Sequence, residues 1–332
     1  MDHDGRITIK DIAKETNLSI ATVSRVLANT GEHNGETVKK VQNAAIKMGY
    51  IKNTSAVELV QRTSHVIAVI VSNTKSNFSD SIISAIEDQA VQNNLDVFIL
   101  HAGHADEVSQ ERAIKTVSER AVKGIILVSL ELNDHILQLL KEAGISCVCL
   151  STSVKNSVFP FVTSDNFKMG YAATDFLIKK GHKKIGIAGI PADGSISQRI
   201  AGYSQCMQDH NLQIKKAWIQ YGDCTYDDGV QAMKNYREQE PITAVICASD
   251  FVGVGLMNTA TKMGIKVPVQ LNIISFDGTN LVDIVRPRIT SVTQQFYAMG
   301  TEGIDFILKK RSFTSKYLPF KIVERESTSS IN

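Results

Sequence analysis

A short segment near the N-terminus carries side chains suited to reading the edges of DNA bases. Ile20 and Ala21 open a predicted helix, and Arg25 follows one turn later on the same outward face. An arginine side chain can donate two hydrogen bonds to O6 and N7 of a guanine. Hydroxyl groups before and within this helix suit phosphate contacts, which fix the position of a protein on DNA rather than its sequence preference. The hydroxyl-bearing candidates are Thr8, Ser19, Thr22 and Ser24.

Three short predicted helices would position these side chains. Thr8 is a suitable N-cap for a first helix, and Ser19 for a second. Asn17 lies in the turn between them and tolerates the left-handed conformation that such turns often need. A third helix over about residues 36–48 would end at Gly49. This pattern predicts a helix-turn-helix unit, whose second helix enters the major groove. The periodicity alone is equally compatible with a small bundle that exposes a solvated arginine.

The rest of the chain alternates apolar runs with amphipathic stretches, which predicts a mixed α/β fold. The runs are typical of parallel strands, because strands covered on both faces are continuously apolar. They occupy residues 66–71, 95–100, 124–129, 147–150, 184–190, 244–249 and 272–276. The alternation indicates doubly wound sheets with right-handed crossovers. About 270 residues exceed one usual sheet, so we expect two lobes.

Composition and charge place the chain among ordinary globular proteins. It is 43% hydrophobic and 21% charged, which argues against a disordered or fibrous protein. The longest apolar runs are too short to cross a bilayer, and no secretory signal is visible, so we expect a cytoplasmic protein without a membrane span. The net charge of +2 lies entirely in residues 1–62, with nine Lys+Arg against seven Asp+Glu, which weakly favours a nucleic-acid module there.

The cysteine, histidine and glycine patterns predict no metal site, no cofactor and no enzyme. The five cysteines form no CxxC pair and are expected to be reduced. Cys147 and Cys149 are expected on opposite faces of a strand. His101 and His104 are interpreted as part of a solvated loop rather than a metal site. The nucleotide-binding, nucleophile and metalloprotease motifs GxxxxGK[ST], GxSxG and HExxH do not occur.

The N-terminal motif resembles the DNA-binding head of the lactose-repressor (LacI/GalR) family. The similarity lies in D-I-A at 11–13 and in S-x-x-T-V-S-R-V at 19–26. The family's hinge pattern Y-x-P-N-x-x-A-x-x-L follows, with Lys52 in place of the proline that would restrict the chain. The resemblance implies that Leu59 enters the minor groove as an apolar wedge. The other DNA contacts that it implies are Asn29, Asn53 and Ala56.

Later motifs resemble the family's sensor in the expected order, which implies two Rossmann-like lobes of periplasmic-binding-protein type with an effector in their cleft. A carboxylate accepts hydrogen bonds from adjacent sugar hydroxyls and a guanidinium donates to them. Asp277 and Arg199 match the family's effector-binding pair, although a turn aspartate and a solvated arginine are the alternatives. The other implied effector-binding residues are Phe78, Ser151, Cys224, Ser249 and Asp250. Ser151, Cys224 and Ser79 replace an acidic and two aromatic residues, which implies a less acidic and less aromatic pocket than usual.

These patterns together divide the chain into four parts. We expect a head at 1–50, a hinge at 51–63, a first lobe at 64–162 with about 292–318, and a second lobe at 163–291 with about 319–332. The predicted function is a homodimeric repressor of carbohydrate-utilisation genes. It would bind palindromic double-stranded DNA under the control of a sugar or sugar phosphate. Two alternatives stay open. One is a global catabolite-control regulator with a phosphorylated carrier protein as corepressor, and the other is a stand-alone sugar-binding protein.

Overall fold

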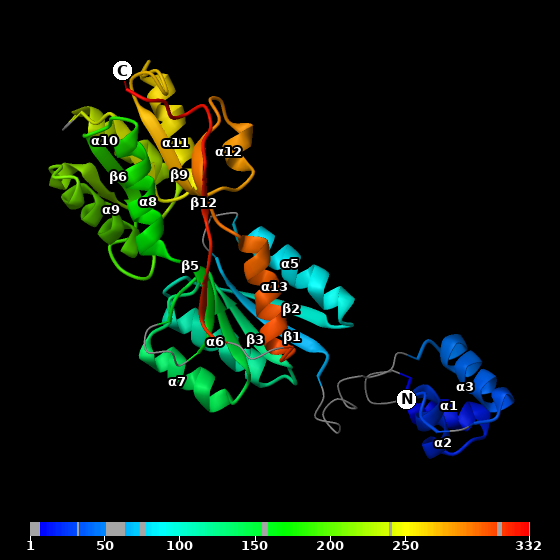
Figure 1. Ribbon diagram of the computed structural model, residues 1–332. Helices are drawn as coiled ribbons and strands as arrows, with labels where there is room; N and C mark the ends of the chain where they lie inside the picture. Colours follow the sequence, from blue (N-terminus) through cyan, green and yellow to red (C-terminus); the bar gives the residue numbers. More distant parts are fainter. Residues whose placement is uncertain are drawn as a thin grey trace. The chain divides into compact units, whose positions relative to one another are not determined.

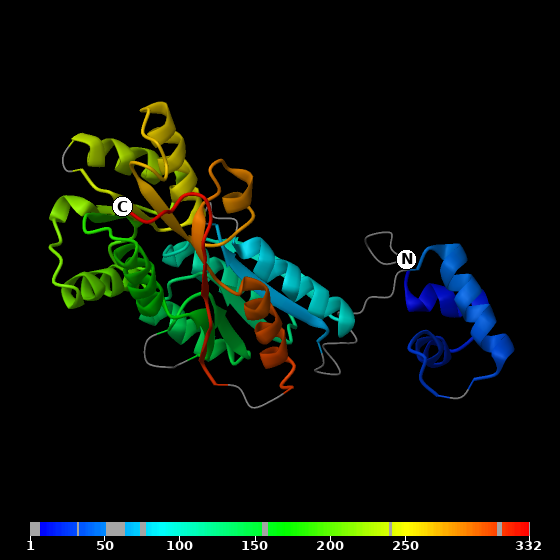
Figure 2. The ribbon, with the colours of Figure 1, turned by 45° about the horizontal axis from the view of Figure 1, so that its top comes forward.

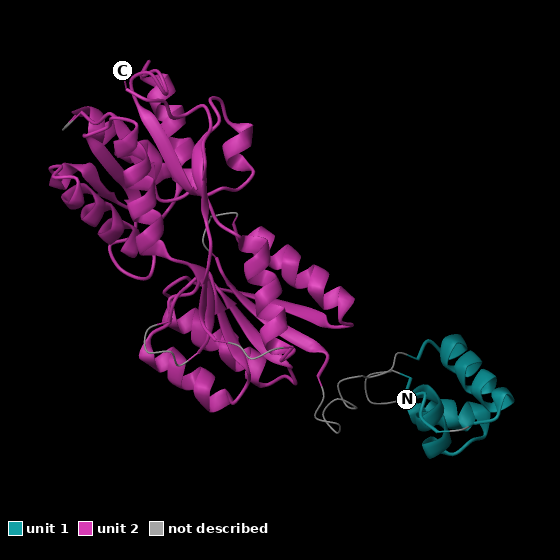
Figure 3. Cartoon of the chain, in the orientation of Figure 1, with its two compact units in different colours: residues 1–63 teal, residues 64–332 magenta. Residues whose placement is uncertain are grey.

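The computed structural model describes residues 7–31, 33–50, 64–73, 78–154, 159–238, 241–310 and 314–331. Figures 1 and 2 draw its helices and strands from two directions. The chain divides into two compact units, residues 1–63 and residues 64–332 (Figure 3). Within the described residues, no helix is both long and apolar enough to cross a membrane. The hinge residues singled out above lie outside the described residues: Lys52, Asn53, Ala56 and Leu59.

The described residues of the first unit form three helices: α1 (Ile9–Thr16), α2 (Ile20–Leu27) and α3 (Gly35–Met48). The predicted caps are confirmed, since Thr8 is the N-cap of α1 and the Ser19 hydroxyl accepts a hydrogen bond from the Thr22 amide at 3.0 Å. Asn17 takes the expected left-handed conformation with φ 54°, and Gly49 ends α3 with φ 69°. Local side-chain chemistry therefore fixes where each helix begins and ends.

A small apolar core holds these helices together. Its fully buried side chains are Ile12 from α1, Val23 from α2 and Val41 from α3. Val23 and Val26 of α2 are buried and three residues apart, so they share one face of the helix and leave the opposite face turned outward. The consequence is a fixed outward orientation for the residues predicted to read DNA.

The first sheet of the second unit is wholly parallel, with strand order β11-β5-β4-β3-β1-β2. Its strands are β1 (Val66–Ser72), β2 (Asp96–Ala102), β3 (Gly124–Val128), β4 (Cys147–Leu150), β5 (Phe161–Ser164) and β11 (Lys316–Leu318). Helices α5 (Ser79–Gln92) and α13 (Phe296–Ile307) pack on one face, and α6 (Glu107–Ser118) and α7 (Asp134–Ala143) on the other.

The continuous apolar runs are explained by this covering of both faces. In β1, Ile67 and Val69 pack toward α5 and α13, whereas Ala68 packs toward α6 and α7. The expectation that Cys147 and Cys149 lie on opposite faces is wrong, because both pack in the cluster beneath α6 and α7. Side chains two residues apart on a strand share a face.

The second sheet has the order β12-β10-β9-β8-β6-β7, and only the edge pair of β10 and β12 is antiparallel among its described pairings. Its strands are β6 (Ile185–Ile190), β7 (Ile219–Tyr221), β8 (Ala244–Cys247), β9 (Asn272–Asp277), β10 (Thr290–Thr293) and β12 (Lys321–Val323). The helices beside it are α8 (Asn166–Lys179), α9 (Gln198–Asp209), α10 (Tyr226–Glu238), α11 (Asp250–Lys262) and the short α12 (Leu281–Ile284).

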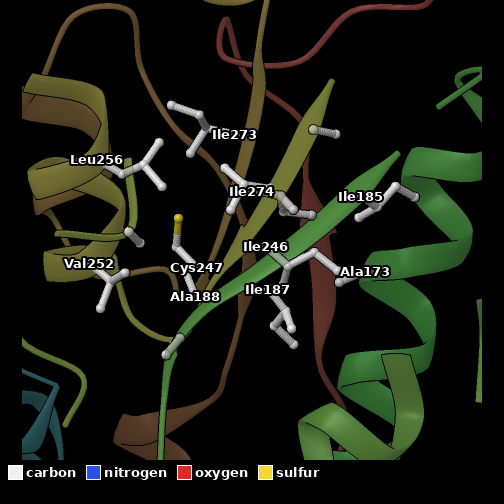
Figure 4. Packing of buried hydrophobic residues seen from close by; sticks show 14 of the residues in the cluster. Ala173, Ile185, Ile187, Ala188, Ile246, Cys247, Val252, Leu256, Ile273 and Ile274 are labelled. Carbon is white, nitrogen blue, oxygen red and sulfur yellow. The ribbon is translucent and has the colours of Figure 1, made fainter. Parts of the chain in front are cut away.

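One apolar core runs through both faces of this second sheet. Figure 4 shows Val252 and Leu256 of α11 on one side of the strands and Ala173 of α8 on the other. Trp218 is buried in this core at the end of a short 3₁₀ turn, and β7 starts directly after it. The core therefore fixes α8 and α11 against the strand ends that carry the predicted effector residues.

The chain passes between the two sheets three times: after β5, after β10, and between β11 and β12 (Figures 1 and 2). The first sheet takes its strands from residues 66–164 and 316–318, and the second from residues 185–293 and 321–323. The boundaries expected at residues 162 and 291 fall inside β5 and β10. We name the two sheets with their helices the first lobe and the second lobe.

Candidate nucleic-acid interface and effector site

The outward face of α2 presents the side chains predicted to read DNA. Ile20 of α2 is 50% exposed. Apolar contacts of this kind suit the methyl group of thymine in the major groove, and arginine suits guanine. The predicted contacts that lie exposed in the first unit are Ser19, Ile20, Ala21, Ser24, Arg25 and Asn29. The helix can therefore offer apolar, hydroxyl and guanidinium groups to one groove.

The predicted phosphate-binding hydroxyls are not equally available. Oγ1 of Thr8 donates to Oδ2 of Asp11 at 2.7 Å, and the Thr8 amide donates to the same oxygen. These two hydrogen bonds lower the pKa of Asp11 and commit the Thr8 hydroxyl to the start of α1. Oγ of Ser19 and Oγ1 of Thr22 lie 2.8 Å apart, so one hydroxyl donates to the other. That pair retains one O–H group that can donate to a phosphate.

In the second lobe, Arg199 at the start of α9 lies against the carboxyl ends of β8 and β9. Its Nε donates to Oδ1 of Asn166 at 2.8 Å, and its Nη1 donates to the Ala248 carbonyl oxygen at 2.7 Å. Its Nη2 lies 4.0 Å from Oδ1 of Asp277, and its guanidinium carbon lies 4.4 Å from the centre of the Phe276 ring. Burial lowers the pKa of Arg199, and the charges of the neighbouring carboxylates offset only part of this shift. The predicted pair of Arg199 and Asp277 is thus close together and buried.

Asp277 connects this arginine to the crossover that follows β10. Oδ1 of Asp277 accepts a hydrogen bond from Nε2 of Gln294 at 3.0 Å, and the Gln294 amide donates to the Asp277 carbonyl oxygen. Burial raises the pKa of Asp277, while the charge of Arg199 lowers it. Movement at the Asp277 carboxylate can therefore reach the segment that leads back to the first lobe.

Asp250, at the start of α11, is held by four donors of its own lobe. Oδ1 accepts hydrogen bonds from Ser275 at 2.5 Å and from Ser291 at 3.2 Å, and Oδ2 accepts from the Thr279 amide and hydroxyl at 2.7 and 2.8 Å. Burial and the charge of Asp277 nevertheless raise the pKa of Asp250 to about 7. An effector contact by Asp250 would compete with these donors, of which the Thr279 amide and hydroxyl hold the loop after β9.

Ser249 and Cys224 lie at the same edge of the second sheet. Oγ of Ser249 accepts from the Val252 amide at 3.2 Å and donates to the Cys224 carbonyl oxygen at 2.8 Å. Burial raises the pKa of the Cys224 thiol to about 12, although Arg199 opposes this shift. Cys224 therefore keeps a neutral thiol buried at this edge of the sheet, while Ser249 ties the Cys224 loop to α11.

Left-handed backbone conformations gather at the carboxyl ends of both sheets. Such conformations are uncommon for residues other than glycine and cluster at functional sites. The non-glycine residues concerned are Ser129 after β3, Ser151 after β4, Cys224 after β7 and Asp277 at the end of β9. Ligands of open α/β sheets bind outside these strand ends. The residues with left-handed backbone conformations and the predicted effector residues thus lie at the carboxyl ends of the strands in the two sheets.

Two cavities lie between the two lobes. The smaller, of about 650 Å³, is lined by Phe78 from the first lobe, by residues 278–280 of the second, and by the crossover at residues 294–298. Phe78 stacks on Phe296 with ring centres 4.9 Å apart. The larger, of about 710 Å³, is lined by residues of both lobes, most of them polar, including Glu131 and Ser195. Both volumes lie in the usual range for small-molecule sites.

Of the predicted effector residues, only Phe78 lines either cavity. Arg199 and Asp277 are buried behind the rim, where Asn166 links Arg199 to the larger cavity. Sequence analysis did not single out Glu131, although it follows the carboxyl end of a predicted strand, which is a usual place for ligand contacts. Oε1 of Glu131 accepts hydrogen bonds from the amide and hydroxyl of Ser195 at 2.8 and 2.7 Å, and so joins the lobes.

Ser164 is a further residue that sequence analysis missed, because β5 was not predicted. Its side chain is buried and lines the larger cavity. No hydrogen-bond partner of its Oγ atom is found among the residues that the structure describes. Buried hydroxyls are normally paired, so this group is suited to a hydrogen bond with a bound molecule.

Comparison with known proteins agrees with this arrangement. Residues 8–53 match the family model described as bacterial regulatory proteins, lacI family. Residues 64–298 match the model of periplasmic binding proteins and the sugar binding domain of the LacI family. The first match contains the helix-turn-helix unit and the second contains most of both lobes. The two models thus cover the two compact units in the order found here.

Individual relatives match over nearly the whole chain. The HTH-type transcriptional regulator RegA of Clostridium acetobutylicum is 33% identical over 96% of this chain and 98% of its own length. Catabolite control protein A of Priestia megaterium is 29% identical over 97% and 99%. A solved complex of the transcriptional regulator CelR with cellobiose is 26% identical, covers 97% of this chain and all of its own, and has a TM-score of 0.72. The chain belongs to the LacI family of bacterial transcriptional regulators.

Proposed function

We propose that this regulator is a homodimeric repressor that reads a palindromic operator through α2 and is switched by a neutral sugar in the cleft between its lobes. The observation that carries the proposal is the outward face of α2, where Ile20, Ala21 and Arg25 are exposed on a unit with its own apolar core. A two-fold symmetric operator matches a two-fold symmetric protein. Since the operator is chromosomal DNA, the repressor would act in the cytoplasm, and it would act by binding rather than by catalysis.

The chemistry of the larger cavity favours a sugar over a sugar phosphate. Its described lining carries no lysine or arginine and four carboxyl-bearing residues: Glu131, Asp134, Asp165 and Asp193. These would repel a phosphate group, whereas carboxylates accept hydrogen bonds from hydroxyl groups. Serine and amide side chains at the same wall can donate as well as accept. The complex of CelR with cellobiose, a neutral disaccharide, supports this class of effector.

The DNA-reading role is tested by measuring the affinity of the full-length protein for a selected palindromic duplex and for an unrelated duplex. Arg25→Ala should weaken operator binding by about 10–100-fold, the loss expected for one base-specific arginine contact. Binding to the unrelated duplex should fall much less. The matched control is Lys14→Ala, which also removes one positive charge. Lys14 is exposed and lies at the other end of the turn. Equal losses on both duplexes would reject base reading by Arg25.

The effector role is tested by screening neutral sugars and sugar phosphates for thermal stabilisation, since a ligand of the folded state raises its stability by mass action. Arg199→Lys keeps the charge but loses the planar fork, and should weaken the response at least about tenfold while the effector-free affinity for operator is retained. A response that survives unchanged would remove Arg199 from effector recognition. Stabilisation only by phosphorylated sugars would reject the neutral class.

The similarity to Catabolite control protein A favours a second candidate, a global regulator whose corepressor is a phosphorylated carrier protein. The two functions are distinguished by titrating operator complexes with sugars alone and with a phosphorylated carrier protein alone. A repressor of the first kind responds to the sugar alone. A response that requires the phosphoprotein would favour the second candidate.

A further inference from the structure

Three metal-binding side chains meet on the second lobe, in a cluster that the effector site does not use. They are Asp175 of α8, Cys206 of α9 and His210 at the end of α9. One ligand atom of each lies within 4.8 Å of the other two. Cys206 is fully buried, Asp175 is half-buried and His210 is exposed, so the cluster is closed at Cys206 and open to solvent at His210.

The close packing of α8 and α9 brings these residues together. A Cβ atom on Gly170 would lie 2.2 Å from the Arg199 carbonyl oxygen, and one on Gly202 would lie 2.0 Å from that of Phe167. Only glycine permits this approach of two helix backbones. Cys206 and His210 are four residues apart and therefore share the face of α9 that looks toward α8. The third residue, Asp175, comes from the facing helix.

The donor atoms are near the separations of a tetrahedral site. Nε2 of His210 lies 3.6 Å from Oδ1 of Asp175, and one ligand atom of each of the three residues lies within 4.8 Å of the others. Zinc bonds of about 2.3 Å to sulfur and about 2.0–2.2 Å to nitrogen and oxygen place such donors about 3.3–3.6 Å apart. Small side-chain movements would therefore complete three bonds, and water can take the fourth position from the open side.

Neighbouring groups already orient the ligands. Nδ1 of His210 lies 2.9 Å from the Cys206 carbonyl oxygen, which accepts hydrogen bonds only, so Nδ1 carries the ring proton and Nε2 keeps its lone pair. Nζ of Lys179 lies 2.6 Å from Oδ2 of Asp175 and leaves Oδ1 turned toward His210. Such outer hydrogen bonds fix the tautomer and direction of metal ligands.

We propose that Asp175, Cys206 and His210 bind a zinc ion through one carboxylate oxygen, one thiolate and one imidazole nitrogen. Mixed sulfur, nitrogen and oxygen ligands suit zinc or cobalt rather than magnesium or calcium. The ion would join α8 to α9 at their carboxyl-terminal ends. The opposite ends of the same helices are joined by the hydrogen bond from Arg199 to Asn166. The site is separate from the DNA and effector roles and does not depend on them.

The test uses the full-length protein, stripped of metal and titrated with Co²⁺ and then with Zn²⁺. One equivalent of Co²⁺ should give a thiolate-to-cobalt charge-transfer band, which Zn²⁺ should remove. Cys206→Ala should abolish the band, and Asp175→Asn or His210→Ala should weaken binding at least about tenfold. His135→Ala is the matched control, because His135 also lies beside a carboxylate, that of Glu111 at 3.5 Å. It should change nothing.

Thermal unfolding without metal identifies any variant that fails to fold. If Cys206→Ala fails to fold, the near-isosteric Asp175→Asn variant still tests the site. Zn²⁺ should raise the unfolding temperature of the parent chain and not that of a folded Cys206→Ala chain. The absence of a thiolate band in the parent chain would overturn the proposal. So would a band of full strength in Cys206→Ala, because another cysteine would then be the ligand.

Discussion

Asp250 illustrates how a single buried carboxyl group can make this fold sensitive to pH. Four hydrogen-bond donors surround it, yet burial and the charge of Asp277 outweigh them and raise the pKa of Asp250 to about 7. The pKa of an aspartate in an unfolded chain is about 3.8. The folded protein therefore keeps a proton on Asp250 over a pH range in which the unfolded chain has lost it. Ionising Asp250 therefore costs free energy in the folded protein but not in the unfolded chain.

We expect the stability of the Asp250→Asn variant, relative to the parent chain, to rise with pH. The stabilising contribution of a raised pKa is complete below about pH 3.8 and is lost as the pH rises to about 7. An amide cannot ionise, so the variant escapes this loss, of roughly 1–4 kcal/mol. Its altered hydrogen bonds cost the same at every pH. Denaturant unfolding of both proteins between pH 4 and pH 8 measures the difference, and a pH-independent difference would refute the shift.

The α8–α9 pair carries Arg199 and Asn166, which lie beside the carboxyl end of β8 in the second lobe. Gly170 and Gly202 let the two backbones come into contact, and Arg199 donates to Asn166 at the start of the pair. Glycine is unfavourable in a helix interior by about 1 kcal/mol relative to alanine. These glycines are therefore explained by packing against the other helix rather than by helix propensity.

The variant Gly202→Ala should destabilise the protein by about 1–3 kcal/mol, because its new Cβ atom would lie 2.0 Å from a backbone oxygen of α8. Helix propensity alone predicts the opposite sign, a gain of about 1 kcal/mol. Ala201→Gly, at the exposed neighbouring position, measures that propensity effect in the same helix. Denaturant unfolding decides between the two signs. A stabilised Gly202→Ala protein would mean that α8 and α9 are not in contact there.

The two lobes are coupled by more than the three chain crossings. Glu131 of the first lobe accepts two hydrogen bonds from Ser195 of the second, and Gln294 in a crossover donates to Asp277. An effector changes the lobe arrangement only to the extent that it binds two arrangements unequally. The Glu131–Ser195 hydrogen bonds are specific to the arrangement seen here and would be lost if the lobes separated.

Removing the Glu131 acceptor should release the Ser195 amide to solvent. In Glu131→Ala, hydrogen exchange at that amide should speed up at least about tenfold, which corresponds to the loss of about 1.4 kcal/mol of protection. Glu131→Gln keeps an oxygen acceptor and should give a smaller increase. The Ala248 amide, bonded to Ala188 inside the second lobe, serves as the internal reference. Unchanged exchange at Ser195 would show that Glu131 does not hold the lobes together.

The sequence by itself determined the local elements of this protein. Caps and turns act within a few residues, so Thr8, Asn17 and Ser19 were sufficient to place α1 and α2. Buried strands are apolar on both faces, so the run at 147–150 predicted β4 with its observed bounds. The resemblance to the LacI family selected Arg199 and Asp277, and in the structure Nη2 of Arg199 lies 4.0 Å from Oδ1 of Asp277. Polar or short strands such as β5 and β11 gave no comparable signal.

Only the tertiary structure decided which distant residues meet. The strand order, the three crossings and the contact of Glu131 with Ser195 depend on how two lobes exchange segments. The cluster of Asp175, Cys206 and His210 depends on two glycines that bring α8 against α9. A sequence pattern records what each segment buries, because burial repeats with the period of its helix or strand. It does not record which other segment covers that face, and this is settled by packing over long sequence separations.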